Sequence, residues 1–252
     1  MEIQAAQNPG PTLRASSEIC GKPASDTVCL ADSTEMFLFL DAAGREPFVG
    51  VWAHGIWLAC RYAEKQAATE SLFTLIDDAL RGPWGLSMKL ADCGGFIFTE
   101  GPGSILGIRI VAMALRGWRA LPGLAHKPIY AVGSLELSAH LLLRAKPERR
   151  DFTLLADSRQ GWWNTAVVRD GVVAHGFNEV RGTELSMLPG PFFRITQRAL
   201  GAPPVACEPL PEDLLERDPT VLAMPNLLRE TDAPDAVNMP GQFVKWEPAR
   251  HR

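Results

Sequence analysis

Residues 93–121 read CGGFIFTEGPGSILGIRIVAMALRGWRAL, and this pattern predicts a strand, a tight turn and a long helix in direct succession. Residues 96–98 form an aromatic and β-branched run between turn residues, which is typical of a buried strand. The Gly-Pro-Gly run at 101–103 then breaks the chain, because glycine accepts positive φ and proline is rigid. Ser104 can cap the helix that follows, since its hydroxyl can accept a bond from one of the first helical N–H groups. Nothing in residues 105–121 interrupts a helix.

The predicted helix is apolar around most of its circumference. Its apolar residues form three stripes at helical spacing: Ile105, Ile108, Ala112 and Leu115; Leu106, Ile110, Met113 and Gly117; and Gly107, Val111, Ala114 and Trp118. A helix on the surface of one domain needs a single apolar stripe, so this helix must be covered on more than one side. One side can face a sheet, and another can face a neighbouring helix or a second protein. A membrane span is excluded, because Arg109 interrupts a run that is already shorter than the roughly 20 residues a bilayer requires.

Residues 101–110, GPGSILGIRI, resemble the GPGSFTGLRI signature of the TsaB family, also called YeaZ. Three further segments resemble family motifs in the same order and at similar spacing. FLFLDAA at 37–43 is similar to the opening strand with its DTS turn, residues 68–80 to a first helix led by His-Ser-Glu, and LLADSRQG at 154–161 to the DAR-x-G strand. Together these segments extend the resemblance over most of the chain from about residue 36.

The chain also departs from the family pattern, as a divergent member would. The departures are Ala42 and Ala43 for the hydroxyl residues of the DTS turn, Ala68 and Thr69 for the His and Ser of the first helix, and Ile105 and Leu106 for the Phe and Thr of the signature. The acid that follows in the first helix, Glu70, is kept.

The resemblance implies an α/β fold of the ribonuclease-H-like type, with two lobes, as in actins, sugar kinases and Hsp70 proteins. It also implies a non-catalytic, cytoplasmic subunit that supports threonylcarbamoyl transfer to adenosine of tRNA. The implied partners are a TsaD-type catalytic subunit and a TsaE-type ATPase, with tRNA reached only through the complex. When alone, such a subunit is expected to form a homodimer, with no cofactor and no membrane contact.

Length, net charge and cysteine content limit the classes of protein to which the chain can belong. The chain has 252 residues, of which 46% are hydrophobic, and this is ample for a core. A net charge of −4 argues against a free-standing nucleic-acid-binding domain, because such domains are usually basic. The five cysteines are scattered and contain no C-x-x-C spacing, so zinc binding and thioredoxin-type chemistry receive no support and free thiols are expected.

The pattern along the chain predicts three regions. Residues 1–34 have several prolines and no hydrophobic period, and we expect a disordered, dispensable extension. Residues 35–127 are expected to form the first lobe, and 128–252 a smaller lobe and tail. The expected elements are strands within 36–63, a helix at 67–81, a strand at 128–133, a helix at 134–145 capped by Ser134, strands with an Asp170-Gly171 hairpin turn in 152–180, and helical pieces at 212–217 and 225–230. Residues 239–248 resemble the closing segment of the family.

The predicted helices at 67–81 and 104–121 carry more apolar surface than one sheet can cover. In the first, Leu72 and Ile76 belong to the main apolar face, whereas Phe73 lies off it. The resemblance implies that these two helices pack against the equivalent pair of the catalytic subunit. The residues predicted to bind the partner are Leu72, Phe73, Ile76, Leu106, Gly107, Ile110, Met113 and Ala114. Gly107 and Ala114 would allow the two backbones to approach closely.

Catalytic and metal-binding patterns are lacking in the sequence. The five histidines form no H-x-x-x-H pair, so no metal ligands and no catalytic residues are predicted. No G-x-S-x-G elbow occurs, and no Walker lysine follows the glycine-rich turn. A backbone nest at Gly101, Gly103 and Ser104 can hold an anion at the helix N-terminus, although a tight turn explains the same residues. Asp41 can cap a turn or remain from a nucleotide site, and the turn cap is preferred.

A basic cluster follows the 134–145 helix and is open to two interpretations. Its members are Arg144, Lys146, Arg149 and Arg150. It can contact RNA phosphates, or it can complement the negative end of the helix dipole, which is the preferred interpretation.

Three functions remain possible from the sequence. The first is the scaffold subunit that the resemblance implies. The second is a kinase-like ATPase or M22-type peptidase of the same superfamily, and the third is a homodimeric structural paralogue with no role in tRNA modification.

Overall fold

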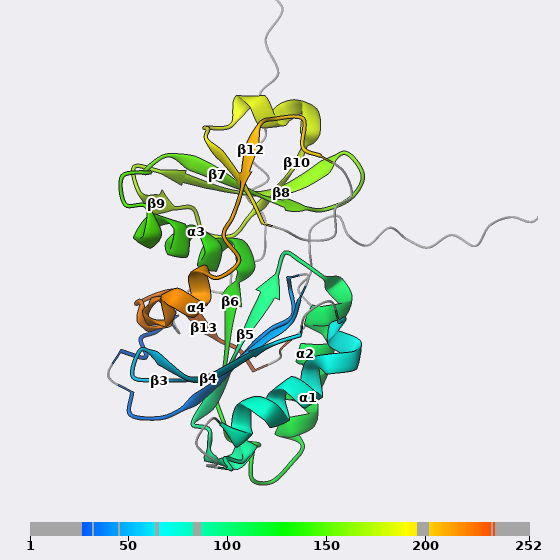
Figure 1. Ribbon diagram of the computed structural model, residues 1–252, viewed down its shortest axis with the longest axis vertical. Helices are drawn as coiled ribbons and strands as arrows, with labels where there is room; N and C mark the ends of the chain where they lie inside the picture. The colour runs from blue at the N-terminus through cyan, green and yellow to red at the C-terminus, as the bar shows by residue number, and fades with distance from the viewer. Residues whose placement is uncertain are drawn as a thin grey trace, which may run out of the picture.

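The computed structural model describes residues 27–31, 33–44, 46–63, 66–82, 87–195, 202–232 and 234. The chain folds into two lobes, each built on its own β-sheet, with helix α3 (Ser134–Ala145) between them (Figure 1). One large hydrophobic cluster spans both lobes. It contains Phe37 and Phe39 from the first sheet together with Phe152 and Phe193 from the second.

In the described part of the chain, the first sheet has seven strands in the order β1-β13-β6-β5-β2-β3-β4, with β1 at Thr27–Val28 and β13 at Leu228–Glu230. Its consecutive strands are β2 (Phe37–Asp41), β3 (Phe48–Ala53), β4 (Ile56–Tyr62), β5 (Gly95–Gly101) and β6 (Ile129–Gly133). β2, β3 and β4 pair antiparallel, whereas β5 pairs parallel with both β2 and β6. Three antiparallel strands followed by two parallel crossovers make the ribonuclease-H-like fold, which confirms the predicted fold class. His54 and Gly55 form the predicted two-residue turn, with φ of 50° and 78°.

Two helices cover one face of this sheet, and their positions agree with the sequence pattern. Helix α1 (Ala68–Arg81) and helix α2 (Ile105–Arg119) lie side by side (Figure 1). Side chains alternate between the two faces of β2. Leu38 and Leu40 pack beneath these helices, whereas Phe37 and Phe39 face the other side of the sheet. Apolar residues that recur at helical spacing in α1 and α2 therefore pack against apolar residues that alternate along β2. No helix in the described part of the chain is long and apolar enough to cross a membrane.

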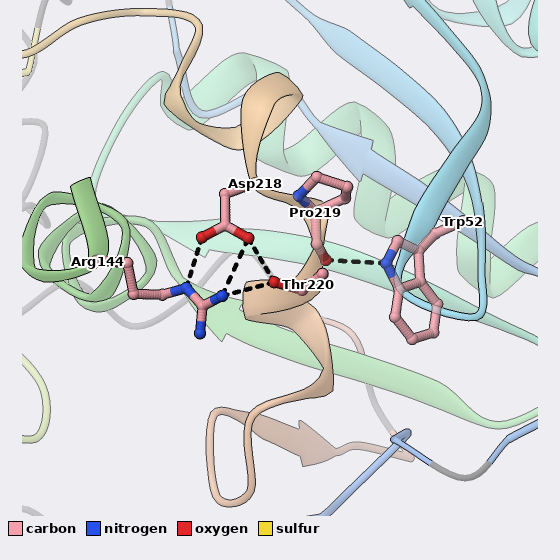
Figure 2. Close-up of polar contacts among 5 residues, drawn as sticks. All are labelled: Trp52, Arg144, Asp218, Pro219 and Thr220. Atoms are coloured by element: carbon pink, nitrogen blue, oxygen red, sulfur yellow. Dashed lines mark hydrogen bonds and ion pairs between the residues drawn. The ribbon is translucent and has the colours of Figure 1, made fainter.

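A return segment from the second lobe covers the opposite face of the first sheet. It contains α4 (Leu214–Arg217), the 3-10 helix η3 (Pro219–Ala223) and β13 (Leu228–Glu230). Figure 2 shows how η3 is held on both sides. The indole Nε1 of Trp52 donates to the carbonyl of Pro219 at 2.9 Å. From α3, Arg144 donates to Asp218 at 2.5 Å and to Thr220 at 2.6 Å.

The second sheet has the order β10-β8-β7-β11-β12, with β9 paired to β8 at the side. Its strands are β7 (Phe152–Asp157), β8 (Trp162–Arg169), β9 (Val172–Val173), β10 (Asn178–Arg181), β11 (Phe192–Arg194) and β12 (Cys207–Pro209). The 3-10 helix η2 (Gly182–Met187) follows β10. Asp170 and Gly171 form the predicted hairpin turn, with φ of 52° and 76°. The expected strand after this turn is divided into β9 and β10.

Part of the N-terminal segment is ordered, although residues 1–34 were expected to form a disordered extension. β1 (Thr27–Val28) pairs antiparallel with β13, and Leu30 is only 4% exposed in the core. The thiol of Cys29 donates to the carbonyl of Ala223 at 3.3 Å. The first lobe therefore begins before residue 34, while residues 1–26 lie outside the described part.

Three further predictions need correction, each because a distant partner decides the local structure. Residues 225–230 were expected to be helical, but β13 forms there because it pairs with β6 and β1. β6 and β13 both belong to the first sheet, so that lobe also takes strands from the region after residue 127. Ser134 does not cap α3, since it is the first helical residue and its hydroxyl donates to the carbonyl of Pro102 at 2.6 Å. The closing segment at 239–248 lies outside the described residues.

Candidate functional site

The glycine-rich turn between β5 and α2 packs against the turn that follows β2. Ser104 caps α2 as predicted, because its hydroxyl accepts the N–H of Gly107 at 3.3 Å. The N–H of Ser104 itself donates to the carbonyl of Ala43 at 2.8 Å. One N–H group of an anion-binding nest at Gly101, Gly103 and Ser104, that of Ser104, is thus already bonded within the chain. The arrangement favours the tight-turn interpretation of these residues.

The close neighbour predicted for Gly107 is the chain's own backbone. A Cβ at Gly107 would lie 2.1 Å from the carbonyl oxygen of Ala42, and one at Gly103 would lie 2.3 Å from that of Ala43. Both contacts are far too short for any side chain. These glycines are required for internal packing, and Gly107, predicted to lie in a partner interface, packs against the chain's own backbone.

Asp41 caps the turn after β2, as the sequence indicates. Its Oδ1 accepts the N–H of Ala43 at 2.8 Å and the hydroxyl of Thr99 at 2.6 Å. Burial raises the pKa of this carboxyl, and the hydrogen bonds from Thr99, Ala43 and Gly44 oppose that rise. Ala42 and Ala43 are each only 2% exposed, and neither carries the hydroxyl of the DTS turn that the family has there.

A cavity of about 310 Å³ lies beside this turn, between the two lobes. Its apolar walls include Phe48 and Leu141, and its hydroxyls come from Tyr62, Ser134 and Ser138. The lining residues include five acids, namely Asp41, Glu46, Glu212, Asp213 and Glu216, and no basic residue among those that the structure describes. Carboxylates repel phosphate groups unless a metal ion lies between them, so a nucleotide phosphate could enter this lining only together with a metal ion.

The return segment supplies three of those carboxylates, and the sequence analysis did not find them. Glu212, Asp213 and Glu216 lie in a stretch whose acidic composition is visible, but nothing local shows that it returns to the cleft. The hydroxyl of Tyr62 donates to Glu216. Burial, and next the carboxylate of Glu216, raise the pKa of that phenol.

The outward face of α1 and α2 carries the largest exposed apolar side chains of the first lobe's helices. Phe73 on α1 is 57% exposed, and Leu106 and Met113 on α2 are 60% and 69% exposed. Ile110 is partly buried between them. We call these four residues the docking face. Leu106, Ile110 and Met113 belong to one of the three stripes of α2, and this stripe faces away from the sheet.

Four of the eight residues predicted to bind a partner are buried inside the chain instead. Leu72 and Ile76 pack in the core beneath α1, Gly107 lies against the turn after β2, and Ala114 is buried in α2. Spacing alone separates the stripes of a helix but does not assign each stripe to a neighbour. The sheet covers Leu72 and Ile76, and the chain's own packing covers Gly107 and Ala114.

The basic cluster after α3 is satisfied by acids of the chain. Arg144 binds Asp218, as Figure 2 shows. Lys146 and Arg149 both lie near Glu208, at 3.9 and 3.8 Å, and Arg150 donates to the carbonyl of Asp170 at 2.5 Å. These contacts support a structural role over a contact with RNA. Among the described residues, no group of three or more His, Cys, Asp or Glu side chains could hold a metal ion.

Two solved structures resemble this chain over most of their length. YeaZ from Pseudomonas aeruginosa is 21% identical, with a TM-score of 0.52, over 74% of this chain and 90% of that one. The chain has the YeaZ fold. An uncharacterised protein described as similar to the peptidase YeaZ from Pseudomonas aeruginosa is 20% identical, with a TM-score of 0.51, over 72% of this chain and 88% of that one. A scan against protein-family models gave no match, and neither did a search of the curated proteins. The sequence resemblance to YeaZ is thus confirmed at the level of the fold.

Proposed function

We propose that this chain is a non-catalytic scaffold subunit whose docking face binds a TsaD-type catalytic subunit for threonylcarbamoyl transfer to adenosine of tRNA. The observation that carries the proposal is the exposure of Phe73, Leu106 and Met113 on two neighbouring helices. Large apolar side chains that gather on one exposed face usually mark an association site. The YeaZ fold supports the same role, and two of the four segments that resemble TsaB motifs lie on α1 and at the start of α2, which build this face.

The acidic cavity and the buried turn argue against the alternative of a kinase-like ATPase. Phosphates placed near Ala42 and Ala43 would meet side chains that are only 2% exposed, and they would lie beside the carboxylates of the cavity with no basic residue among its described lining. A second protein, in contrast, needs only the docking face. The proposed role therefore uses the exposed docking face and does not use the cavity.

The test places a carboxylate on the docking face. Met113→Glu should leave the fold intact, since this side chain is exposed, but it should prevent copurification with the TsaD-type protein of the native host. A carboxylate buried without a counter-charge costs several kcal/mol, which corresponds to a loss of affinity of about 100-fold or more. Threonylcarbamoyl-adenosine should also fall in the tRNA of a strain that depends on the variant.

The matched control is Met187→Glu in η2, because Met187 is also strongly exposed, at 74%, but lies on the other lobe. This variant should bind the catalytic subunit and support tRNA modification normally. The proposal fails if Met113→Glu, shown to be folded by circular dichroism, keeps both the partner and the modification. Ala114→Glu is not a suitable test, because Ala114 is buried and its replacement would disturb α2 itself.

A further inference from the structure

The described chain ends against the helix that carries most of the docking face. Met113 follows Leu106 by seven residues and Arg116 follows Met113 by three, so all three lie on one side of α2. The Nε of Arg116 donates to the carbonyl of Pro234 at 2.8 Å, and Pro234 is buried. The last residue that the structure describes is therefore bound to a side chain one helical turn from Met113.

The chain also runs toward the docking face as it reaches this point. Arg119, which follows Arg116 by one turn of α2, donates to the carbonyl of Asp232 at 2.5 Å and pairs with its carboxylate at 3.4 Å. Residue 232 is thus held at Arg119 and residue 234 at Arg116, so the chain moves toward the N-terminus of α2. The next side chain on this course is Met113.

The sequence continues beyond Pro234 for 18 residues, DAVNMPGQFVKWEPARHR, which we call the tail. An extended chain spans about 3.3 Å per residue, and the path along α2 from Arg116 to Leu106 is only about 15 Å, so about five residues cover it. Apolar residues recur through the tail, at Val237, Met239, Phe243, Val244 and Trp246. The tail is therefore long enough and apolar enough to cover the docking face on both helices.

Charges on α1 and in the tail are complementary. Glu70 precedes Phe73 by three residues and Asp77 follows it by four, and both carboxylates are exposed. Neither forms an ion pair with any residue that the structure describes. In the tail, Lys245 lies between two apolar residues. A cation in this position can face either carboxylate while its neighbours cover Phe73, and complementary charges of this kind fix the register of a contact.

We propose that the tail folds back over the docking face and must leave it before the catalytic subunit can bind. The inference rests on the docking face of the proposed function and adds the regulation of that face. A short tether gives the tail an effective concentration of about 1 mM, so a segment that binds with a dissociation constant of about 0.1 mM as a free peptide covers the face about nine-tenths of the time. Only the open fraction binds a partner, so removal of the tail should tighten binding about tenfold.

Methyl NMR of methionine-labelled protein tests the fold-back without any partner. Met113 reports on the docking face, and Met187, which is 74% exposed on the other lobe, is the internal control. Deletion of residues 235–252 should shift the methyl signal of Met113 and leave that of Met187 unchanged, and a synthetic peptide of the tail should move the Met113 signal back. A Met113 signal that the deletion does not change overturns the proposal. A signal that shifts with concentration in the full chain shows a second copy on the face, and it also overturns the proposal.

Substitutions in the tail separate its apolar contacts from any effect of the deletion on the fold. In the full chain, Phe243→Ser with Trp246→Ser should reproduce the Met113 signal of the shortened chain. The matched control is Gln242→Ser with Ala249→Ser, which changes the same number of tail residues and should keep the wild-type signal. Identical Met113 signals in the two double variants overturn the proposal, because the apolar side chains of the tail then do not cover the face.

Binding of the TsaD-type protein, measured by isothermal titration calorimetry, tests the regulation separately. The chain without its tail should bind about tenfold more tightly than the full chain, and equal affinities overturn the regulation. If neither form binds the TsaD-type protein, the scaffold role fails, whereas the methionine signals still decide whether the tail covers the docking face.

Discussion

Two glycines of α2 should respond in opposite directions to the same substitution. Alanine is favoured over glycine inside a helix by about 1 kcal/mol. At Gly117 an added Cβ meets no atom within 4 Å, so Gly117→Ala should stabilise the fold by about 0.5–1 kcal/mol. At Gly107 the same Cβ would lie 2.1 Å from the carbonyl oxygen of Ala42, and α2 must shift to accept it.

The cost at Gly107 can be bounded from this contact. Overpacking in a core costs about 1–3 kcal/mol, and a contact this short lies at the upper end of that range. After the gain in helix propensity, Gly107→Ala should lose about 2 kcal/mol, so the two variants should differ by about 3 kcal/mol. For a chain of this size, that corresponds to melting temperatures about 6–12 °C apart. No side-chain change at position 42 can relieve the clash, because the obstacle is a backbone oxygen.

Thermal unfolding followed by circular dichroism measures this difference directly. Urea unfolding gives the free energies independently of the melting temperature. The reasoning is refuted if Gly107→Ala is as stable as the wild type or as Gly117→Ala. In that case the turn after β2 would not be pressed against α2, and the glycines of the turn would regain a role in ligand binding.

Two further predictions follow from the core and from Asp41. Leu30→Ala should lower the free energy of unfolding by about 2–4 kcal/mol in urea, because Leu30 is buried against the return segment and its removal leaves a cavity; an unchanged value would make the N-terminal segment dispensable after all. Because burial raises the pKa of Asp41 above 3.8, its folded state holds the proton more tightly, and ionising it costs stability as the pH rises through the raised pKa. The wild type should therefore lose stability relative to Asp41→Asn as the pH is raised from about 4 to neutrality, and parallel stability curves for the two proteins would contradict this sign.

The elements that local signals define were predictable from the sequence. β5, the turn and α2 follow from an apolar run, two glycines and a capping serine, all within residues 93–121. The hairpins at 54–55 and 170–171 follow from residues that accept positive φ. Each of these features depends on neighbours in the sequence, so no knowledge of distant partners is required.

The features that distant segments determine were not predictable. β13 forms a strand because β6 and β1 provide backbone partners, and these override a weak helical pattern. Leu30 is buried for the same reason, since the return segment that covers it lies almost two hundred residues further along the chain. The acidic lining of the cavity has this origin too, because Glu212, Asp213 and Glu216 reach the cleft only through the return segment.

The three stripes of α2 show how much of the functional surface the fold itself explains. Ile108, Ala112 and Leu115 of the first stripe are buried, and so are Gly107, Val111 and Ala114 of the third stripe. Burial inside the folded monomer therefore accounts for the apolar residues of these two stripes. The second stripe gains little from folding, because Leu106 and Met113 remain in water and only Ile110 is partly buried. This stripe is exposed and apolar, and it contains one arginine, Arg109, without an acidic partner in the described chain. Such a surface is typical of a protein interface. The docking face therefore consists of apolar residues whose pattern the folded monomer alone does not explain.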